Sequence, residues 1–223
     1  NYIRFIKSKK FDIAIHFSSE TKTSWLCYFA GIPYHLGDKA KLGLYPIFRK
    51  HGVFLKTFDQ CKHVVEYNFQ LLKPLNIKLN PNIKLSINIE PSDKKKANQL
   101  LLNAGRNKKN KLIGIQIGVG FGNRPIEPEK YAHYITALNK LGNFDFCITT
   151  YSEKEKQFRN RLKQICKVPF LDLEGATIGE LMGLISNYDL YVGVDTGPFH
   201  IAAALGTPQL AIFPSKKIKP TRW

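Results

Sequence analysis

Short apolar runs alternate with amphipathic stretches along the second half of the chain. The runs at residues 111–117, 144–149 and 209–213 have the length and composition of buried strands. Between them, the stretches 128–141 and 178–185 carry apolar residues at helical spacing, which predicts one helix in each. The second half is therefore predicted to consist of buried strands separated by helices.

The first half shows the same alternation less clearly. A strand is predicted over residues 11–17, followed by a helix near 23–30. The stretch 60–72 has its apolar residues on one face, which predicts an amphipathic helix. Alternating apolar and polar residues over 84–89 predict a strand of the kind found at the edge of a sheet.

A polar segment divides the chain. A helix is predicted from Ser92, a favoured capping residue, to Gly105, which stops it. The residues that follow, 106–111, are polar, charged and rich in Asn. We therefore place the domain boundary here, and predict one domain over residues 1–106 and a second over 107–223.

The most informative local pattern is a predicted strand, turn and helix between residues 188 and 208. The strand Tyr188–Val194 ends abruptly at Asp195. Pro198 has the fixed φ that suits the first position of a helix, and Gly206 closes the short, Ala-rich helix that follows. The helix therefore starts directly after a turn of small and polar residues.

This helix start predicts an anion-binding site. Backbone N–H groups around Gly197 to His200, together with the positive end of the helix dipole, suit a phosphate or pyrophosphate. His200 lies one turn into the helix and can donate to the same anion. Asp195 would repel a phosphate, so we expect it to accept hydrogen bonds from hydroxyls such as those of a sugar. The spacing alone leaves open the alternative that Asp195 caps the helix and His200 packs against the sheet.

A second loop of interest follows the predicted strand at 111–117. Gly118 and Gly120 suggest a dinucleotide-binding loop, but the third glycine of that motif would fall on Asn123. The prolines that follow also delay the next helix, so its start cannot cradle a pyrophosphate directly. We therefore predict no nicotinamide dinucleotide site.

Composition favours an anionic partner. Lys and Arg number 34 against 17 Asp and Glu, which gives a formal net charge of +17. Nucleic acid, anionic lipid and phosphorylated glycolipid all qualify. The basic clusters lack the interleaved aromatic residues of an RNA-binding surface, and a solvated surface explains any one of them. No apolar run approaches the roughly 20 residues of a membrane span, and the first residues lack a signal-peptide pattern, so we expect a soluble or peripheral protein.

The spacing of potential metal ligands predicts no metal site. The four cysteines are scattered without a CxxC pair, which argues against zinc and against a disulfide framework. We expect them to be buried thiols in a reducing cytoplasm. His63 and Glu66 have a helical spacing of three, but two ligands on one helix lack the partners that a metal ion needs.

Residues 195–208, DTGPFHIAAALGTP, resemble the signature of glycosyltransferase family 9, the ADP-heptose:lipopolysaccharide heptosyltransferases. Members of that family have a GT-B fold with two Rossmann-like domains, of which the C-terminal one mainly holds the nucleotide sugar and the N-terminal one the acceptor. The resemblance thus implies an α/β, GT-B-like chain. It further implies that Asp195 meets the donor sugar, while Thr196, Gly197 and His200 meet the diphosphate. It implies no cofactor.

The resemblance assigns three further residues to the donor site. The phosphate-binding loop of the family corresponds to the loop that begins at Gly118, and Arg124 stands nearest to its basic position. Glu153 lies where GT-B enzymes often place an acid that binds the ribose hydroxyls, and we prefer it to Glu155. A solvated acid at a helix start is the alternative for Glu153.

Residues 11–37 resemble the middle of the family's N-terminal domain more weakly, which implies that this domain is incomplete. His16 stands where the family often has an acidic residue. The opening part of the domain, including the loop that carries the catalytic carboxylate, would precede Asn1. The catalytic base is therefore unassigned and expected in that missing segment. Residues 220–223 resemble a loop after which the family has more helix, so we also expect a truncated C-terminus.

By resemblance, the chain transfers a heptose or a related sugar from an ADP-sugar to an inner-core acceptor of lipopolysaccharide, with inversion and without a metal. The expected partners are the ADP-sugar donor and the anionic lipopolysaccharide acceptor, with peripheral contact at the cytoplasmic face of the bacterial inner membrane. Two alternatives remain. One is a catalytically inactive partial heptosyltransferase that still binds nucleotide sugars, and the other is a basic nucleic-acid-binding protein, although we expect no nucleic-acid partner.

Overall fold

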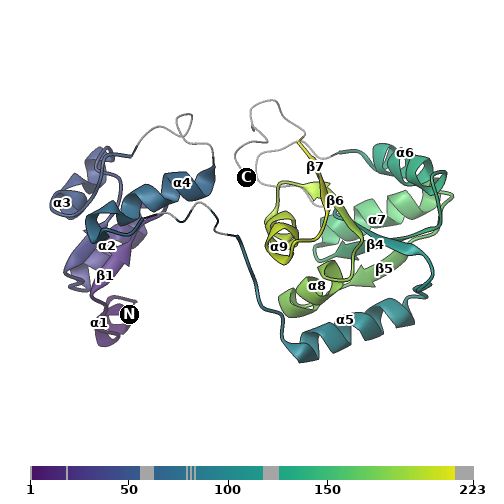
Figure 1. Cartoon of the computed structure of the whole chain (residues 1–223), viewed down its shortest axis with the longest axis horizontal. Helices are drawn as coiled ribbons and strands as arrows, with labels where there is room; N and C mark the ends of the chain where they lie inside the picture. The colour runs from purple at the N-terminus through teal and green to yellow at the C-terminus, as the bar shows by residue number, and fades with distance from the viewer. Residues whose placement is uncertain are drawn as a thin grey trace. The chain divides into compact units, whose positions relative to one another are not determined.

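The computed structural model describes residues 2–18, 20–55, 63–78, 80, 82, 84–117 and 126–213 of the 223-residue chain. These residues form two compact units, the first within 2–82 and the second within 84–213. Figure 1 shows the first unit in purple and blue and the second in teal to yellow.

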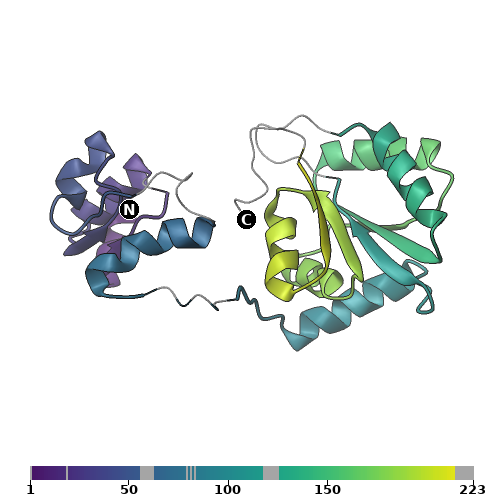
Figure 2. The same cartoon turned by 45° about the horizontal axis from the view of Figure 1, so that its top comes forward.

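A five-stranded parallel sheet forms the centre of the second unit, with the strand order β5-β4-β3-β6-β7. Helices α6 and α7 cover one face, while α5, α8 and α9 lie on the other (Figure 2). The bounds of the strands are β3 Lys111–Ile115, β4 Phe144–Thr150, β5 Leu171–Glu174, β6 Leu190–Val194 and β7 Gln209–Ile212. Those of the helices are α5 Pro91–Asn103, α6 Pro128–Asn139, α7 Glu153–Ile165, α8 Ile178–Ile185 and α9 Gly197–Leu205.

The direction in which strands are added to this sheet reverses between β3 and β6. From β3 the chain adds β4 and then β5 on one side, and afterwards returns to add β6 and β7 on the other side. Both neighbours of β3 are parallel to it. In open α/β sheets, ligands bind in the crevice outside the carboxyl ends of the strands at such a reversal. This end of the sheet is therefore where a ligand site is expected.

Apolar side chains fill the space between the sheet and helices α6 and α7. Ile113 and Ile115 of β3, Phe146 and Ile148 of β4 and Leu162 of α7 are no more than 4% exposed. Alternate residues of a strand face opposite sides of a sheet, and here both sides are covered by helices. The strands of this unit are consequently apolar along most of their length, which is the pattern seen in the sequence.

The opposite face of the sheet buries phenol rings over glycines. The ring of Tyr188 occupies the space that a Cβ on Gly114 would need. The hydroxyl of Tyr188 donates to Cys147 Sγ at 3.4 Å. Packing thus explains why a glycine stands in the central strand β3, because any larger residue at position 114 would displace this ring.

Helix α5 packs against α8, where Gly179 and Gly183 leave space for Asp93 and Ala97. Residues 84–106 consequently lie with the second unit. The structure differs here from the boundary predicted after residue 106. The contacts that hold α5 are tertiary, so they are not visible in the composition of the polar segment that follows it.

The first unit is built on a two-stranded parallel sheet. Its strands β1 (Ile13–Ile15) and β2 (Tyr34–Leu36) are joined through helix α2 (Thr21–Phe29). Buried Leu44, Ile47 and Phe48 form a core against which Trp25 packs. The remaining elements are α1 Tyr2–Ser8, η1 Leu42–Leu44, α3 Tyr45–Phe48, α4 Val64–Phe69 and η3 Gln70–Leu75.

Several predicted elements are shorter than expected or absent. The strand predicted over 11–17 is reduced to the three residues of β1. Residues 84–89 form no strand, because no described strand lies beside them to complete a ladder. The helix predicted over 60–72, described from His63 onward, consists of α4 and the 3-10 helix η3. The helix predicted over 178–185 is confirmed as α8, whose first turn is held by a capping box.

A pair of buried histidines lies at the carboxyl end of the first sheet. His35 Nε2 donates to the Ile32 carbonyl at 2.8 Å, so its Nδ1, which lies 3.2 Å from His16 Nε2, is an acceptor. Ser24 Oγ lies 3.1 Å from His16 Nδ1. Burial, and then the neighbouring His35, lower the pKa of His16 to about 4. His16 is therefore a neutral part of the core at pH 7.

We expect Gly114→Ala to destabilise the second unit, because the added Cβ would overlap the buried ring of Tyr188. Overpacking of this kind costs about 1–3 kcal/mol of the free energy of unfolding. Chemical denaturation measures the loss. Gly142→Ala is the matched control, since a Cβ there meets only the Phe144 ring, at 3.4 Å. Equal losses in the two variants would contradict the packing explanation.

We expect the stability of the first unit to fall as the pH is lowered from 6.5 towards 4. The pKa of His16 is about 4 in the folded chain against 6.5 in the unfolded chain, so the unfolded chain takes up the proton first. At about 1.4 kcal/mol per pH unit, the loss is on the order of 3 kcal/mol. Urea unfolding followed by Trp25 fluorescence at several pH values measures it. His16→Gln should flatten the dependence, and an unchanged slope in that variant would refute the assignment.

Candidate functional site

The predicted strand, turn and helix are present at the strand reversal. Strand β6 begins at Leu190 and ends at Val194, and helix α9 starts at Gly197 and is closed by Gly206 in the left-handed conformation, with φ 71°. The turn between them, Asp195 and Thr196, lies at the carboxyl end of β6 beside the end of β3. This is the position that the topology favours for a ligand.

Thr196 is the residue that precedes the first turn of α9. Its backbone is extended, with φ −142° and ψ 172°, and its side chain makes no capping hydrogen bond to the helix. Instead, Thr196 Oγ1 donates to the Val194 carbonyl at 3.3 Å. A Cβ on Gly197 would meet no atom within 4 Å, so the start of the helix faces open space. These features leave the N–H of Gly197 open to an anion. The prediction of several free N–H groups between Gly197 and His200 is wrong, because Pro198 has no N–H and those of Phe199 and His200 donate to the Thr196 carbonyl at 3.0 and 3.4 Å.

The side chains of Asp195 and His200 meet at this turn. His200 Nε2 lies 3.3 Å from Asp195 Oδ1, and their side chains are 39% and 14% exposed, respectively. Thr196 occupies the capping position of α9, so the alternative in which Asp195 caps this helix is wrong. His200 is half-exposed and its ring meets the edge of Phe199, with 5.4 Å between centroids. The predicted donor residues of this turn are thus brought together in one place.

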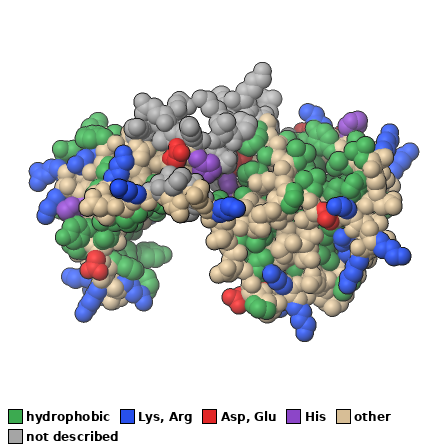
Figure 3. All heavy atoms as spheres, viewed as in Figure 1, with side chains coloured by type: hydrophobic (Ala, Val, Ile, Leu, Met, Phe, Trp, Pro, Cys, Tyr) green, Lys and Arg blue, Asp and Glu red, His purple; other side chains and the backbone are tan. Residues whose placement is uncertain are grey.

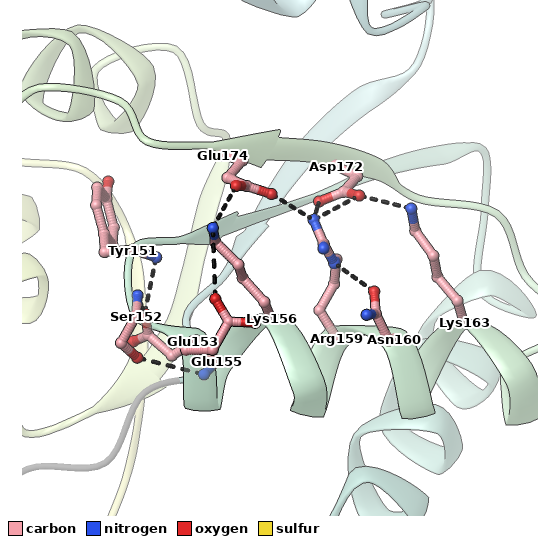
Figure 4. A network of polar contacts seen from close by, with 10 residues as sticks. All are labelled: Tyr151, Ser152, Glu153, Glu155, Lys156, Arg159, Asn160, Lys163, Asp172 and Glu174. Atoms are coloured by element: carbon pink, nitrogen blue, oxygen red, sulfur yellow. Dashed lines mark hydrogen bonds and ion pairs between the residues drawn. The ribbon is translucent and has the colours of Figure 1, made fainter.

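The two acids after β4 have different environments (Figure 4). Glu155 accepts from the N–H groups of Tyr151 at 2.8 Å and Ser152 at 2.9 Å, and so completes a capping box. Glu153, in the same helical turn, is 75% exposed and lies 3.7 Å from Lys156 Nζ. Glu155 is therefore occupied by the helix, while the carboxylate of Glu153 is open to a ligand. The ribose-binding role of Glu153 stays a prediction.

A network of ion pairs fixes helix α7 against the edge strand β5, as Figure 4 shows. Arg159 Nη1 donates to both carboxylate oxygens of Asp172 at 2.8 and 2.9 Å, and Lys163 reaches the same group at 2.5 Å. Lys156 Nζ lies 2.6 Å from Glu174 Oε1, and this hydrogen bond is the largest cause of the lowered pKa of Glu174. The network holds the helix that carries Glu153, and it covers a sheet edge with charges.

Two predicted donor residues, Gly118 and Arg124, lie outside the described residues, and their roles stay predictions. Within the described part of the chain, no group of three or more His, Cys, Asp or Glu side chains could hold a metal ion. The same part contains no helix that is both long and apolar enough to cross a membrane.

Sequence reasoning missed the buried polar side chains beneath the turn. Tyr191 and Gln116 are 2% and 4% exposed, and both lie near Gly193 on the α8 face of the sheet. The sequence could have indicated that Tyr191 and Gly193 lie on the same face of the strand, because they are two residues apart. The direction of the ring along the strand needed the structure.

The sequence matches Glycosyltransferase family 9 (heptosyltransferase) over residues 1–222. Lipopolysaccharide heptosyltransferase 3 of Escherichia coli is 26% identical over 220 residues, which cover 95% of this chain and 62% of that enzyme. The crystal structure of a family 9 glycosyl transferase from Veillonella parvula superposes with a TM-score of 0.77 at 21% identity, covering 94% of this chain and 59% of the other. E. coli heptosyltransferase WaaC with ADP-2-deoxy-2-fluoro heptose gives a TM-score of 0.68 at 16% identity, covering 99% and 67%.

At these identities the structural likenesses show the fold, and the predicted α/β, GT-B-like fold is confirmed. The chain spans 62% of the length of the E. coli lipopolysaccharide heptosyltransferase. The family match itself extends over residues 1–222 and includes the turn that carries Asp195 and His200. The chain therefore belongs to glycosyltransferase family 9.

Proposed function

We propose that this chain binds an ADP-sugar, with heptose as the sugar, and takes part in its transfer to a lipopolysaccharide acceptor. The observation that carries the proposal is the contact between Asp195 and His200 at the start of α9, beside the strand reversal. The relative named lipopolysaccharide heptosyltransferase 3 and the WaaC structure with an ADP-heptose analogue support this choice of donor and acceptor.

The chemistry of the turn suits a sugar diphosphate. The Gly197 N–H and the positive dipole end of α9 attract the diphosphate, and the absence of a side chain on Gly197 lets it approach the backbone. The imidazole ring of His200 has two nitrogens, and both are donors in the protonated ring. One can serve Asp195 and the other a phosphate oxygen. Asp195 keeps acceptor capacity for the hydroxyls of the sugar, which a phosphate could not use.

Transfer would proceed with inversion and without a metal. His200, the start of α9 and, by resemblance, Arg124 would stabilise the negative charge that develops on the departing diphosphate. The group that activates the acceptor hydroxyl is unassigned. In the first unit Asp38 accepts a local hydrogen bond from the Ala40 N–H at 3.0 Å, and His16 is engaged within the core.

The charge of the chain suits an anionic acceptor and an anionic surface. The formal net charge is +17, and Figure 3 shows Lys and Arg side chains over both units with few acidic ones between them. In helix α1, Tyr2 and Phe5 are 79% and 61% exposed, and Lys9 lies over the Phe5 ring. Exposed aromatic rings beside basic side chains are typical of proteins that touch a membrane surface, and they support our proposal that this chain contacts the cytoplasmic face of the inner membrane.

A second candidate function is binding of the nucleotide sugar without transfer. It is favoured because the turn of the donor site is present among the described residues, while no group that activates the acceptor hydroxyl is assigned there. Incubation with ADP-heptose and a heptose-deficient lipopolysaccharide acceptor separates the two candidates. Turnover by this chain alone would exclude the second, and saturable donor binding without turnover would exclude the first.

We expect His200→Ala to weaken ADP binding by at least about tenfold, since a hydrogen bond to a charged group is worth about 1.5–3 kcal/mol. Calorimetric titration of ADP measures the change. His133→Ala is the matched control, because His133 is exposed on α6. Equal affinities of the unmodified chain and His200→Ala would remove the diphosphate role of His200.

We expect Asp195→Asn to affect ADP-heptose more than ADP, because only ADP-heptose carries the sugar hydroxyls that Asp195 is proposed to accept. The amide keeps the size and one acceptor oxygen of the carboxylate but loses its charge. The quantity to compare is the ratio of the two dissociation constants in the variant and in the unmodified chain. A ratio that does not change would place the sugar elsewhere.

A further inference from the structure

Tyr191 of β6 points along its strand towards the turn of the donor site. The residue is 2% exposed. A Cβ on Gly193 would lie 2.8 Å from both Cε1 and the hydroxyl oxygen of Tyr191, so the ring covers Gly193. Gly193 is two residues closer than Tyr191 to Asp195. The hydroxyl end of the ring therefore lies at the carboxyl end of the strand, directly beneath the turn.

The hydroxyl of Tyr191 is buried, and no described residue makes a hydrogen bond of ordinary geometry to it, although the Thr196 hydroxyl lies near enough to influence it. The hydroxyls of two other buried tyrosines in the same unit do donate hydrogen bonds. Tyr131 donates to the Gln116 carbonyl at 3.2 Å, and Tyr188 donates to Cys147 Sγ at 3.4 Å. Buried hydroxyls are nearly always hydrogen-bonded, so an unsatisfied one beneath a ligand site needs an explanation.

Within the turn, the side chain that interacts with the Tyr191 phenol is the hydroxyl of Thr196. Burial raises the pKa of Tyr191, and the Thr196 hydroxyl opposes that rise as a potential hydrogen-bond donor. In the structure, however, the Thr196 hydrogen is directed to the Val194 carbonyl over 3.3 Å, which is long for a hydrogen bond between a hydroxyl and a carbonyl. Thr196 can therefore exchange this contact for a better one.

We propose that Tyr191 is a positioning residue for the donor diphosphate. When the Thr196 hydroxyl turns from the Val194 carbonyl to donate to a phosphate oxygen, its oxygen accepts a hydrogen bond from the Tyr191 phenol. The chain of donors then runs from Tyr191 through Thr196 to the phosphate. A hydroxyl that accepts one hydrogen bond is a stronger donor in another, so the phenol strengthens the contact to the ligand. This inference rests on the proposed function, since it concerns the same diphosphate.

The proposal predicts opposite effects of Tyr191→Phe on binding and on stability. In the free chain the variant removes a buried hydroxyl without a described partner, so we expect its melting temperature to stay equal or rise. In the complex the variant lacks a hydrogen bond, so we expect ADP to bind about 3- to 10-fold more weakly. A hydroxyl with only a structural role would instead lower the melting temperature and leave ADP affinity unchanged.

Tyr188→Phe is the matched control. It removes a buried phenol hydroxyl from the same face of the sheet, but this hydroxyl is bonded to Cys147 and lies over Gly114, away from the turn. We expect this variant to melt at a lower temperature and to bind ADP as tightly as the unmodified chain does.

Thermal melts and calorimetric ADP titrations of the unmodified chain, Tyr191→Phe, Tyr188→Phe, Thr196→Val and the Tyr191→Phe, Thr196→Val double variant test the proposal. The effect of Tyr191→Phe on affinity should vanish in the Thr196→Val background, because the phenol acts through Thr196. An equal effect in both backgrounds, or no effect in a chain that binds ADP, would overturn the role of Tyr191 and leave the proposed function intact. Failure of the unmodified chain to bind ADP would overturn both.

Discussion

The hydrogen-bond ladder between β3 and β6 is the constraint on which the candidate site depends. It pairs Ile113 with Leu190 and Ile115 with Val192, and the Gln116 N–H continues it by donating to the Val192 carbonyl at 2.8 Å. This register sets how far the end of β6 extends beyond the end of β3. A slip of one residue would turn Asp195 to the other face of the sheet, away from α9. The geometry of the turn therefore follows from pairing that lies well below it.

The two faces of this sheet serve different purposes. The face under α6 and α7 is apolar and supplies hydrophobic stabilisation. The face under α8 and α9 buries the Tyr191 phenol and Gln116 close to the carboxyl edge, where Gly193 provides the space for the ring, while the Tyr188 ring lies over Gly114, farther from that edge. Polar groups buried at an edge that binds a ligand can be satisfied by the ligand or by the residues that it moves, whereas the same groups in the centre of a core could not. The placement of Tyr191 is consistent with that difference.

Much of this site could be predicted from the sequence because its parts are local. Asp195 and His200 are five residues apart in one strand-turn-helix unit, so their spacing and the glycine at position 206 already predict where they lie. The domain boundary was misplaced because α5 is held by contacts with α8, far along the chain. Residues 84–89 alternate between apolar and polar side chains but form no strand. Such alternation indicates which face of a strand would be buried, but a strand also needs a neighbour to pair with, and no described strand lies beside these residues. Long-range pairing is the information that a single sequence lacks.

The polar groups at the carboxyl edges of the two sheets differ in burial and in their access to a ligand. In the first unit, His16 is 8% exposed, both of its ring nitrogens face hydrogen-bonding groups, and its pKa is lowered to about 4. In the second unit, Asp195 and His200 stay partly exposed and paired with each other. A general base needs a nitrogen or oxygen that can reach the proton it removes. His16 could meet this requirement only by giving up the contacts of its ring nitrogens in the core of its own unit, so we do not assign it as the group that activates an acceptor. Asp195 and His200, by contrast, can contact a ligand without such a loss, which is why the proposal is built on their turn and not on the buried histidines.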